Sequence, residues 1–258
     1  MKEKQETDFK RAISLINRVT DFNLYHYKIK PLRRRIRSRM RRLGINSYED
    51  YTNYIITNRD EITILENAIT INLTRFFRNK AVFDFIKDEI IPSIDNPFIW
   101  SAGCANGAEA YSISILCQEL NKNYSIIGTD IDKESIKKSR KGVFDNFAMQ
   151  EVEQYILNKY FEKSENIFRI KKEVKEKVTF QYLDLKDIDF INKFDLIICR
   201  NVLIYLSKEF QEQILLSFYK ALKSKGYLIL GKVETIVRSA KNLFNQISLN
   251  NRIYQKSE

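Results

Sequence analysis

The segment FIWSAGCANGAEAYSISIL, residues 98–116, constrains the fold more strongly than any other stretch of the sequence. An apolar run leads into a loop with a glycine at each end, Gly103 and Gly107, and an amphipathic helical pattern follows. Glycine lets a backbone turn tightly and approach a ligand, and the exposed amides at a helix N-terminus favour electron-rich groups. The segment therefore predicts a strand, a ligand-binding loop and a helix in succession.

The spacing of these glycines excludes two common phosphate sites. The loop reads GxxxG, whereas dinucleotide sites carry GxGxxG and nucleoside triphosphate sites carry GxxxxGK followed by Ser or Thr. The next apolar run, YSIIGTD, ends at Asp130, 23 residues after Gly107. A carboxylate at the carboxyl end of a parallel strand can accept both ribose hydroxyls. Asp130 could instead cap the following helix, although Asp132 is better placed for that. Loop and acid together predict a nucleoside-containing cofactor.

From residue 98 onward, short apolar runs alternate with amphipathic helical patterns. This order is typical of an α/β fold, in which a mostly parallel sheet carries helices on both faces. The predicted strands are residues 98–101, 125–129, 178–182, 195–199 and 227–230, with a small extra strand at 166–170. The predicted helices begin near Ala108, Lys133 and Lys208. Residues 246–249 and 252–254 flank a turn sequence, Asn250-Asn251, which predicts an antiparallel hairpin at the edge of the sheet.

Residues 1–75 show no alternating strand pattern, but apolar residues recur there at helical spacing. Three helices are predicted, on Phe9, Ala12, Ile13 and Ile16, on Leu32, Ile36, Met40 and Leu43, and on Tyr51, Tyr54 and Ile55. The second should stop at Gly44, and Asn46 and Ser47 can cap the third. We therefore expect a helical domain over residues 1–78 and an α/β domain over residues 79–258.

The second of these helices is strongly basic. It carries nine basic residues and no acidic one: Lys28, Lys30, Arg33, Arg34, Arg35, Arg37, Arg39, Arg41 and Arg42. A charged face is often simply solvated, but unbalanced like charges at i,i+4 repel by roughly 0.2–0.5 kcal/mol per pair. The pattern therefore favours an acidic partner, in line with a formal net charge of +11. Charge alone does not choose among nucleic acid, anionic lipid and an acidic protein face.

The composition disfavours several kinds of protein. The three cysteines, Cys104, Cys117 and Cys199, form no CxxC pair, so neither a disulfide framework nor a zinc site is expected. The single histidine, His26, argues against Ser-His-Asp catalysis and histidine-based metal sites. No apolar run approaches the roughly 18 residues of a membrane helix, and the start of the chain lacks the apolar core of a signal peptide. We expect a cytoplasmic protein that is not inserted in a membrane.

Three further segments place polar residues near the same edge of the predicted sheet. NLTRFFR, residues 72–78, mixes polar donors with aromatic residues, although it could be an interdomain packing segment. Asp184-Leu185 follows a predicted strand, where a simple turn is the alternative. In FDLIICRNVLIYL, Cys199-Arg200-Asn201 follows a buried strand and Tyr205 precedes a helix. An arginine and an asparagine at the end of a strand are unusual as structural residues, so these segments are candidates for a binding site.

Together, these motifs resemble the CheR-type chemotaxis receptor methyltransferases, a family that methylates glutamate side chains with S-adenosylmethionine. The resemblance rests on NLTRFFR, WSAGCANGAEAYS, GTDID, CRNVLIY and GKVE, in the order and approximate spacing of the family. It covers most of the chain. It implies a Rossmann-like S-adenosylmethionine-dependent methyltransferase domain with a small β-subdomain inserted at about residues 155–177, preceded by a small all-α domain.

The resemblance also implies roles for individual residues. Those expected to bind S-adenosylmethionine are Asn72, Thr74, Arg78, Gly103, Glu109, Asp130, Asp184, Leu185, Cys199 and Arg200. Arg78 and Tyr205 are expected to face the substrate glutamate as catalytic residues. Ala108 and Ala110 stand where the family usually has Glu and Pro, and Asp184 stands where Asn is common. An aspartate can still accept a proton from the adenine amino group, so we expect activity to survive.

The substrate that the resemblance implies is the cytoplasmic helical region of chemotaxis receptors, methylated by a monomeric enzyme. On the basic helix, Arg34, Arg35, Arg39 and Arg42 are expected to bind this glutamate-rich region. Some family members also dock on a receptor C-terminal pentapeptide through a glycine-bearing loop. Residues 161–174 contain no glycine, so we expect independence of the pentapeptide.

Two alternatives remain open at this point. One is an RNA or DNA methyltransferase, motivated by the net charge and the arginine-rich helix. Enzymes that methylate base amino groups usually carry an Asn/Asp-Pro-Pro-aromatic motif, which CRNVLIY lacks, so no nucleic acid partner is expected. The other is a catalytically silent protein that binds the cofactor or the receptor.

Overall fold

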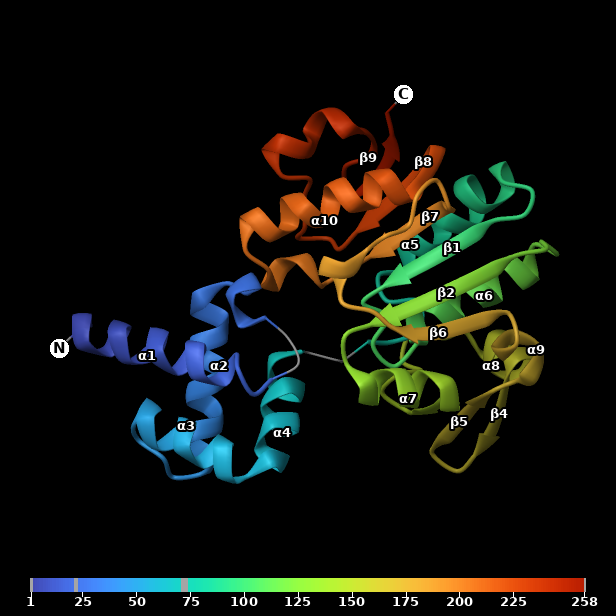
Figure 1. Ribbon diagram of the computed structural model, residues 1–258. Helices are drawn as coiled ribbons and strands as arrows, with labels where there is room; N and C mark the ends of the chain where they lie inside the picture. The colour runs from blue at the N-terminus through green and yellow to red at the C-terminus, as the bar shows by residue number, and fades with distance from the viewer. Residues whose placement is uncertain (1, 21–22, 71–73, 258) are drawn as a thin grey trace. The chain divides into compact units, whose positions relative to one another are not determined.

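The computed structural model describes residues 2–20, 23–70 and 74–257, which fold into two units (Figure 1). The helical unit comprises Met1–Ile71 with Tyr205–Phe210, and the α/β unit comprises Asn72–Ile204 with Gln211–Glu258. Each unit has its own buried apolar residues. The helical unit therefore takes in a segment from late in the chain, which a boundary drawn along the sequence does not include.

The division falls after residue 71, whereas the sequence predicts a boundary after residue 78. The reason is aromatic packing within the α/β unit. The Phe76 ring lies 4.8 Å from that of Phe144 and 5.0 Å from that of Phe161, both in edge-to-face contact. These contacts bind residues 74–78 to the α/β unit.

The helical unit is built from short helices with buried apolar stripes. Their bounds are α1 Lys2–Ile16, α2 Ile29–Arg42, α3 Tyr48–Thr57 and α4 Arg59–Ile69, with a 3-10 turn, η1, at Leu24–His26. After α2, Gly44 adopts the left-handed conformation at φ +70°, as expected for a C-terminal cap. The Ser47 hydroxyl accepts the Asp50 amide at 3.0 Å, which caps α3.

The fourth helix of this unit was not predicted. Asn58 is both the last capping residue of α3 and the first of α4, so the two helices follow each other without a loop. A signal was present, because Asp60 and Glu61 lie in the first turn, where acidic residues favour the helix dipole. Leu65 and Ile69 then provide the buried stripe of α4.

The α/β unit is centred on a seven-stranded sheet in the order β6-β2-β1-β7-β8-β10-β9. Its strands are β1 Phe98–Ala102, β2 Ser125–Asp130, β6 Val178–Tyr182, β7 Phe194–Cys199, β8 Leu222–Leu230, β9 Phe244–Ser248 and β10 Ile253–Lys256. Neighbouring strands in the part β6-β2-β1-β7-β8 of this order pair in parallel, and β10 pairs antiparallel with β8 and β9. The predicted parallel strands and the predicted edge hairpin are both confirmed.

The chain order reverses beside β1, which creates a switch point between β1 and β7. From β1 the chain proceeds outward through β2 to β6, and it then returns to the other side of β1 as β7. In open α/β sheets ligands bind beyond the carboxyl ends of the strands at such a point. The residues that follow β1 and β7 are therefore the first candidates for a site.

Helices pack on both faces of this sheet. On one face, Trp100 of β1 lies 5.3 Å from the Phe218 ring of α10, Lys208–Ala221. Its neighbour Ile99 points the other way and joins a buried cluster with Ile113 of α6, Ala108–Glu119. A third helix, α7 at Lys133–Lys141, packs against β2 and β6 (Figure 1). All three begin at the predicted residues.

A second, three-stranded antiparallel sheet has the order β3-β5-β4. Its elements are β3 Val143–Asp145, α8 Gln154–Tyr160, β4 Phe161–Ser164, β5 Ile167–Ile170 and α9 Lys172–Lys175. β5 is the predicted extra strand. β3 and β4 were not predicted, because each buries a single residue, Phe144 and Phe161, and shows no alternation. The sheet begins at residue 143, ahead of the expected 155–177.

The remaining short elements are α5 Lys80–Phe85, a π-helical turn η2 Ile86–Ile90, and the 3-10 turns η3 Ile91–Ser93, η4 Leu185–Asp187, η5 Leu203–Tyr205 and η6 Arg238–Leu243. The three cysteines are free and buried. Within the described ranges, every helix is too short or too polar to cross a membrane.

Candidate functional site

The loop after β1 lies at the carboxyl ends of the parallel strands. The amides of Gly103 and Cys104 donate to the Thr129 carbonyl oxygen of β2 at 2.7 and 2.9 Å, which folds the loop over the end of that strand. Gly107 has φ +87° and precedes the first turn of α6, a conformation that favours glycine. The loop thus brings the N-terminus of α6 beside the end of β2.

Asp130 at the end of β2 is buried and is bound by the same loop. Its Oδ2 accepts the Ala105 amide at 2.8 Å, and its Oδ1 accepts the Asp132 amide at 2.9 Å. Burial raises the pKa of Asp130 to about 6, and the amide hydrogen bonds partly oppose this rise. Each carboxylate oxygen has a second lone pair, so Asp130 can also accept hydroxyl protons. Asp132 caps α7 by accepting the Glu134 amide, as expected.

A buried polar network joins the ends of β1 and β7. The Ser101 hydroxyl donates to Glu109 Oε1 at 2.9 Å, and Arg200 Nη1 donates to Glu109 Oε2 at 3.2 Å. Arg200 Nη2 donates to the carbonyl oxygen of Arg78 at 2.7 Å. The structure therefore brings together three predicted site residues, Glu109, Arg200 and Arg78, that are far apart in the sequence.

One donor of this network has no acceptor among the described residues. Arg200 Nε is buried and makes no hydrogen bond there. A buried polar group without a partner costs roughly 1–3 kcal/mol, which a ligand acceptor at this point would recover. Asp130 offers a carboxylate to hydroxyl groups along the same edge. These residues fit a nucleoside-containing cofactor, which presents both hydroxyl donors and polar acceptors.

Thr74 and Arg78 share a pocket of the α/β unit. Its volume is about 230 Å³, and it is lined by Thr74, Arg75, Arg78 and Phe147. The segment is held by its backbone, since the Phe77 amide donates to the Ser112 hydroxyl of α6 at 3.0 Å. The Arg78 side chain is half-buried at this pocket. Asn72, expected in the same segment, lies outside the described residues.

Asp184 lies at the same sheet edge, directly after β6. The Leu183 amide donates to the Asp130 carbonyl oxygen at 3.1 Å, which joins the ends of β6 and β2. The buried Asp184 carboxylate accepts the Lys186 amide at 3.0 Å and pairs with Lys186 Nζ at 3.1 Å. Leu185 begins the 3-10 turn that follows. A turn therefore follows β6, as the sequence allowed, and it lies at the sheet edge that carries the other candidate binding residues.

Two buried thiols also lie at this edge, Cys104 in the loop after β1 and Cys199 at the end of β7. Burial raises the pKa of each thiol well above its ordinary value. A thiol in this state stays protonated at neutral pH, and a protonated thiol is a poor nucleophile. Cys199 is therefore a small, uncharged side chain at the end of β7.

Tyr205 belongs to the helical unit. Its carbonyl oxygen accepts the Lys28 amide at 2.8 Å, and its ring lies 4.5 Å from the guanidinium carbon of Arg35. Arg35 is itself held by a hydrogen bond from Nη1 to the Ile69 carbonyl oxygen. No sequence pattern predicts this contact between the basic helix and Tyr205.

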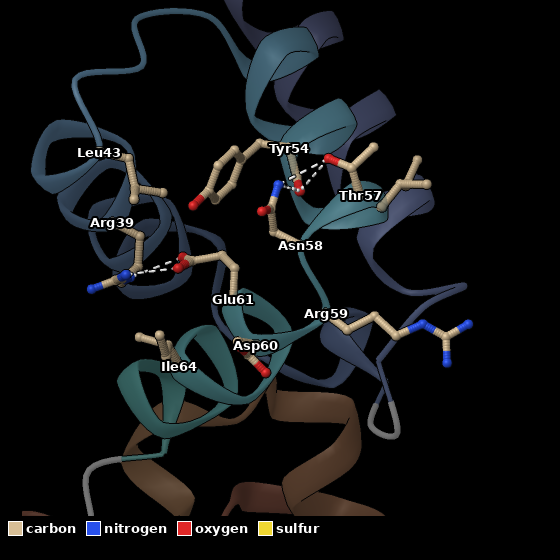
Figure 2. Close-up of a pocket in the computed structure, with 10 residues that line it drawn as sticks. Arg39, Leu43, Tyr54, Thr57, Asn58, Arg59, Asp60, Glu61 and Ile64 are labelled. Carbon is tan, nitrogen blue, oxygen red and sulfur yellow. Dashed lines mark hydrogen bonds and ion pairs between the residues drawn. The ribbon is translucent and has the colours of Figure 1, made fainter.

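The four arginines expected to bind a receptor separate into two pairs. Arg34 and Arg42 are exposed, whereas Arg35 is buried against Tyr205. Arg39 forms a bidentate ion pair with the buried Glu61, at 2.9 Å from Nε to Oε1 and 2.7 Å from Nη2 to Oε2 (Figure 2). This pair lies beside a pocket of about 610 Å³ between α2, α3 and α4. The expectation that Arg35 and Arg39 present their charge outward is therefore corrected.

The period of the helix explains this result. Residues 35 and 39 lie three positions after Leu32 and Ile36, so they fall on the inward side of α2 with the apolar stripe. Arg33 and Arg37 also find partners within the unit, Glu6 and the Tyr48 hydroxyl. The exposed basic residues of the α2 region are Lys28, Lys30, Arg34, Arg37, Arg41 and Arg42, and of these Arg37 donates to the Tyr48 hydroxyl.

Two site-supporting residues were not singled out from the sequence. Ser101 and Ser112 are buried, and each fixes a functional segment, Ser101 through Glu109 and Ser112 through the Phe77 amide. The sequence did contain a pattern that indicates them, because both serines occupy inward positions within apolar elements. A buried hydroxyl needs a partner, and the nearby polar segments were available to supply it.

The chain matches two family descriptions that together span most of its length. "CheR methyltransferase, all-alpha domain" matches residues 7–70, and "CheR methyltransferase, SAM binding domain" matches residues 72–253. The junction between the matches coincides with the division between the two units.

Curated relatives are similar over nearly their whole length. A chemotaxis protein methyltransferase of Borreliella burgdorferi is 30% identical over 92% of this chain and 90% of that protein. One of Listeria innocua is 28% identical over 98% of each, and one of Escherichia coli is 30% identical over 89% of this chain and 84% of that protein. Among solved structures, PKMT2 from Rickettsia typhi in complex with AdoHcy is 17% identical over 61% of this chain and 26% of that chain, with a TM-score of 0.40, too distant to add to the assignment.

Proposed function

Because the chain belongs to the CheR methyltransferase family and is an S-adenosylmethionine-dependent methyltransferase, we propose that it methylates glutamate side chains of chemotaxis receptors. The products are glutamate methyl esters and S-adenosylhomocysteine. The observation that carries this proposal is the succession of both family domains along residues 7–253. Relatives named chemotaxis protein methyltransferase support the same substrate class.

The residues at the sheet edge fit the cofactor. When bound, S-adenosylmethionine supplies an electrophilic methyl group on a positively charged sulfur. Asp130 would accept the ribose hydroxyls, and Glu109, which Ser101 and Arg200 hold, would bind the charged end of the methionine part. Thr74 and Arg78 line the neighbouring pocket. The adenosine part would be bound by the remaining expected residues, Gly103, Asp184, Leu185 and Cys199.

The attacking group needs no activation by a base. A glutamate side chain has a pKa near 4.3, so its carboxylate is ionised at neutral pH. Attack of this carboxylate on the methyl group would neutralise the negative charge of the carboxylate and the positive charge of the sulfur and would move no proton, so the chain's own residues need not supply a general base. The shortage of histidine in this chain is consistent with such a reaction.

The protein therefore contributes alignment of the two reactants. Orienting two reactants correctly can lower a barrier by up to about 7–11 kcal/mol. Arg78 holds the substrate carboxylate through its guanidinium, and Tyr205 orients it by a hydrogen bond from its hydroxyl. Tyr205 is itself fixed by Arg35 and by the Lys28 backbone.

The exposed part of the basic helix binds the glutamate-rich receptor helices. Its charges are those of Lys28, Lys30, Arg34, Arg41 and Arg42. Binding of acidic helices to such a face is electrostatic and weakens with salt. The chain acts as a monomer at the cytoplasmic region of the receptors.

Binding to the receptor does not require a C-terminal pentapeptide. The hairpin between β4 and β5 has only Glu165 and Asn166 in its turn. A two-residue turn that lacks glycine leaves no loop to receive a peptide at this end of the small sheet.

The direct test is transfer of radiolabelled methyl from S-adenosylmethionine to receptor-containing membranes. We expect base-labile label on the receptor that is released as methanol. Label on nucleic acid would replace the proposal with a nucleic acid methyltransferase. Cofactor binding without transfer to either would indicate a silent binding protein.

A further inference from the structure

The GKVE segment after β8 carries a buried carboxylate that the proposed mechanism does not use. Glu234 is 4% exposed. Its Oε2 accepts the amides of Gly231 at 2.5 Å and Asn201 at 2.9 Å, and its Oε1 accepts the amide of Ile204 at 3.1 Å. Two of these three donors belong to the loop between β7 and α10. Glu234 therefore ties that loop to the end of β8.

The carboxylate is bound as an anion in a cradle of backbone amides. Three converging N–H groups stabilise a negative charge, much as backbone amides bind phosphate or carboxylate ligands. Burial raises the pKa of Glu234, whereas the amides of Asn201, Gly231 and Ile204 lower it. A neutral side chain of the same shape lacks this charge and would direct an amide NH₂ group at some of the donors.

Gly231 shows how close this approach is. A β-carbon at this position would lie 2.5 Å from Glu234 Oε2 and 2.8 Å from the Asn201 nitrogen. Real side chains essentially never come so close, so residue 231 must be glycine for Glu234 to reach the loop. The contact between Glu234 and the loop therefore depends on the glycine at position 231 of the same GKVE segment.

The loop that Glu234 holds lies between two site residues. It follows Arg200, which binds Glu109 and the Arg78 carbonyl oxygen, and it leads directly into Tyr205. Asn201 adopts the left-handed conformation at φ +63°, which asparagine tolerates better than most other residues with a side chain. The Glu234 carboxylate holds the loop at this residue by accepting the Asn201 amide.

We propose that Glu234 is a positioning residue, which fixes residues 201–204 between the ends of β7 and β8, and that Tyr205, the next residue of the chain, depends on this loop for its role in methyl transfer. This inference rests on the proposed function, because it assigns Glu234 to support of the role proposed for Tyr205. It predicts that Glu234 acts through Tyr205 and that cofactor binding depends on it little.

The test is a double-mutant cycle with the full-length enzyme. Glu234→Gln, Tyr205→Phe and the double variant are compared with wild type for kcat and for the KM of receptor methylation, and S-adenosylmethionine affinity is measured by calorimetry. We expect Glu234→Gln to lower kcat about tenfold or more while cofactor affinity changes less than about threefold. In the Tyr205→Phe background, the further loss from Glu234→Gln should be less than about threefold.

A matched control is available on β7, the strand that precedes the loop held by Glu234. Asp195, at the start of β7, also accepts a backbone amide, that of Phe98 at 2.8 Å, and pairs with Lys223. It lies at the opposite end of β7 from the site. Asp195→Asn should lower the melting temperature without lowering kcat. Glu234→Asp, which keeps the charge on a shorter side chain, should recover part of the lost kcat.

The possible results distinguish failure of the positioning role of Glu234 from failure of the proposed function. Wild-type kcat in Glu234→Gln, equal losses in both backgrounds of the cycle, or a parallel fall in cofactor affinity would each overturn the positioning role. If Glu234→Gln does not fold, Gly231→Ala supplies the same test, because its methyl group displaces the Glu234 carboxylate. Failure of the wild-type enzyme to methylate receptors would instead overturn the proposed function.

Discussion

The Arg39 guanidinium and the Glu61 carboxylate form a bidentate ion pair that links α2 to α4 inside the helical unit. Glu61 is 3% exposed, and its Oε1 also accepts the Tyr51 hydroxyl of α3 at 2.8 Å. Three helices therefore meet at one carboxylate. This arrangement divides the arginines of α2 into those that maintain the fold and those available to a partner.

Charge reversal should distinguish these two groups. Arg39→Glu leaves Glu61 buried beside a like charge, so we expect the free energy of unfolding to fall by about 3–5 kcal/mol. The paired reversal Arg34→Glu with Arg42→Glu changes only exposed residues, so stability should stay nearly constant while the KM for receptor rises, most strongly at low salt. Thermal unfolding and receptor methylation at two salt concentrations check both results. Equal stability losses in the two variants would contradict the division.

The catalytic roles proposed for Arg78 and Tyr205 predict losses of different size. Arg78→Ala removes the charge that holds the substrate carboxylate, and we expect kcat/KM to fall about 100-fold or more. Tyr205→Phe removes one hydrogen bond and should cost about tenfold in kcat. Steady-state methylation of receptor membranes measures both. Lys80→Ala, which removes an exposed charge paired with Glu153, serves as control and should leave kcat unchanged. Wild-type rates in the first two variants would remove these residues from the mechanism.

The buried Asp130 predicts opposite pH trends for binding and stability. Its pKa is raised to about 6, and protonation weakens its acceptance of ribose hydroxyls, so cofactor affinity should fall as the pH decreases below about 6. The free energy of unfolding should change with pH in the direction opposite to that of cofactor affinity. The pKa in the unfolded chain is near 3.9, so this group stabilises the fold fully below about pH 4, and that contribution is lost as the pH rises through about 6.

Calorimetric titration and thermal unfolding between pH 5 and 7 measure these two trends. Asp130→Asn has no carboxylate to titrate, so both dependences should flatten relative to wild type, and its affinity should be low throughout. A wild-type affinity that is unchanged from pH 7 to pH 5 would show that Asp130 does not hold the ribose as an anion.

The short turn between β4 and β5 predicts that a receptor C-terminal pentapeptide is not bound. An isolated pentapeptide should give no heat in calorimetric titration, and a receptor lacking its last five residues should be methylated at the same rate as the intact receptor. Saturable binding of the peptide, or slower methylation of the shortened receptor, would contradict this prediction.

Much of the candidate site was predictable because its parts are local. The Gly103–Gly107 loop, Asp130 at a strand end and Arg200 after β7 each follow from a pattern within a few residues. The contacts that assemble them were not predictable. Arg200 reaches Glu109 across 91 residues and the Arg78 carbonyl oxygen across 122. Such pairs depend on strand order and on which side of each strand a residue faces.

The sequence by itself determined the helix starts at Ala108, Lys133 and Lys208, the end of α2 before Gly44, and the parallel strands of the sheet. These features depend on capping, turn conformation and periodicity, which act within one or two turns of chain. Only the tertiary structure decided that Arg35 lies against Tyr205, that Arg39 faces inward, and that Glu234 reaches the loop after β7. A charged side chain can bind solvent or a distant partner with similar free energy, so its direction is settled by packing.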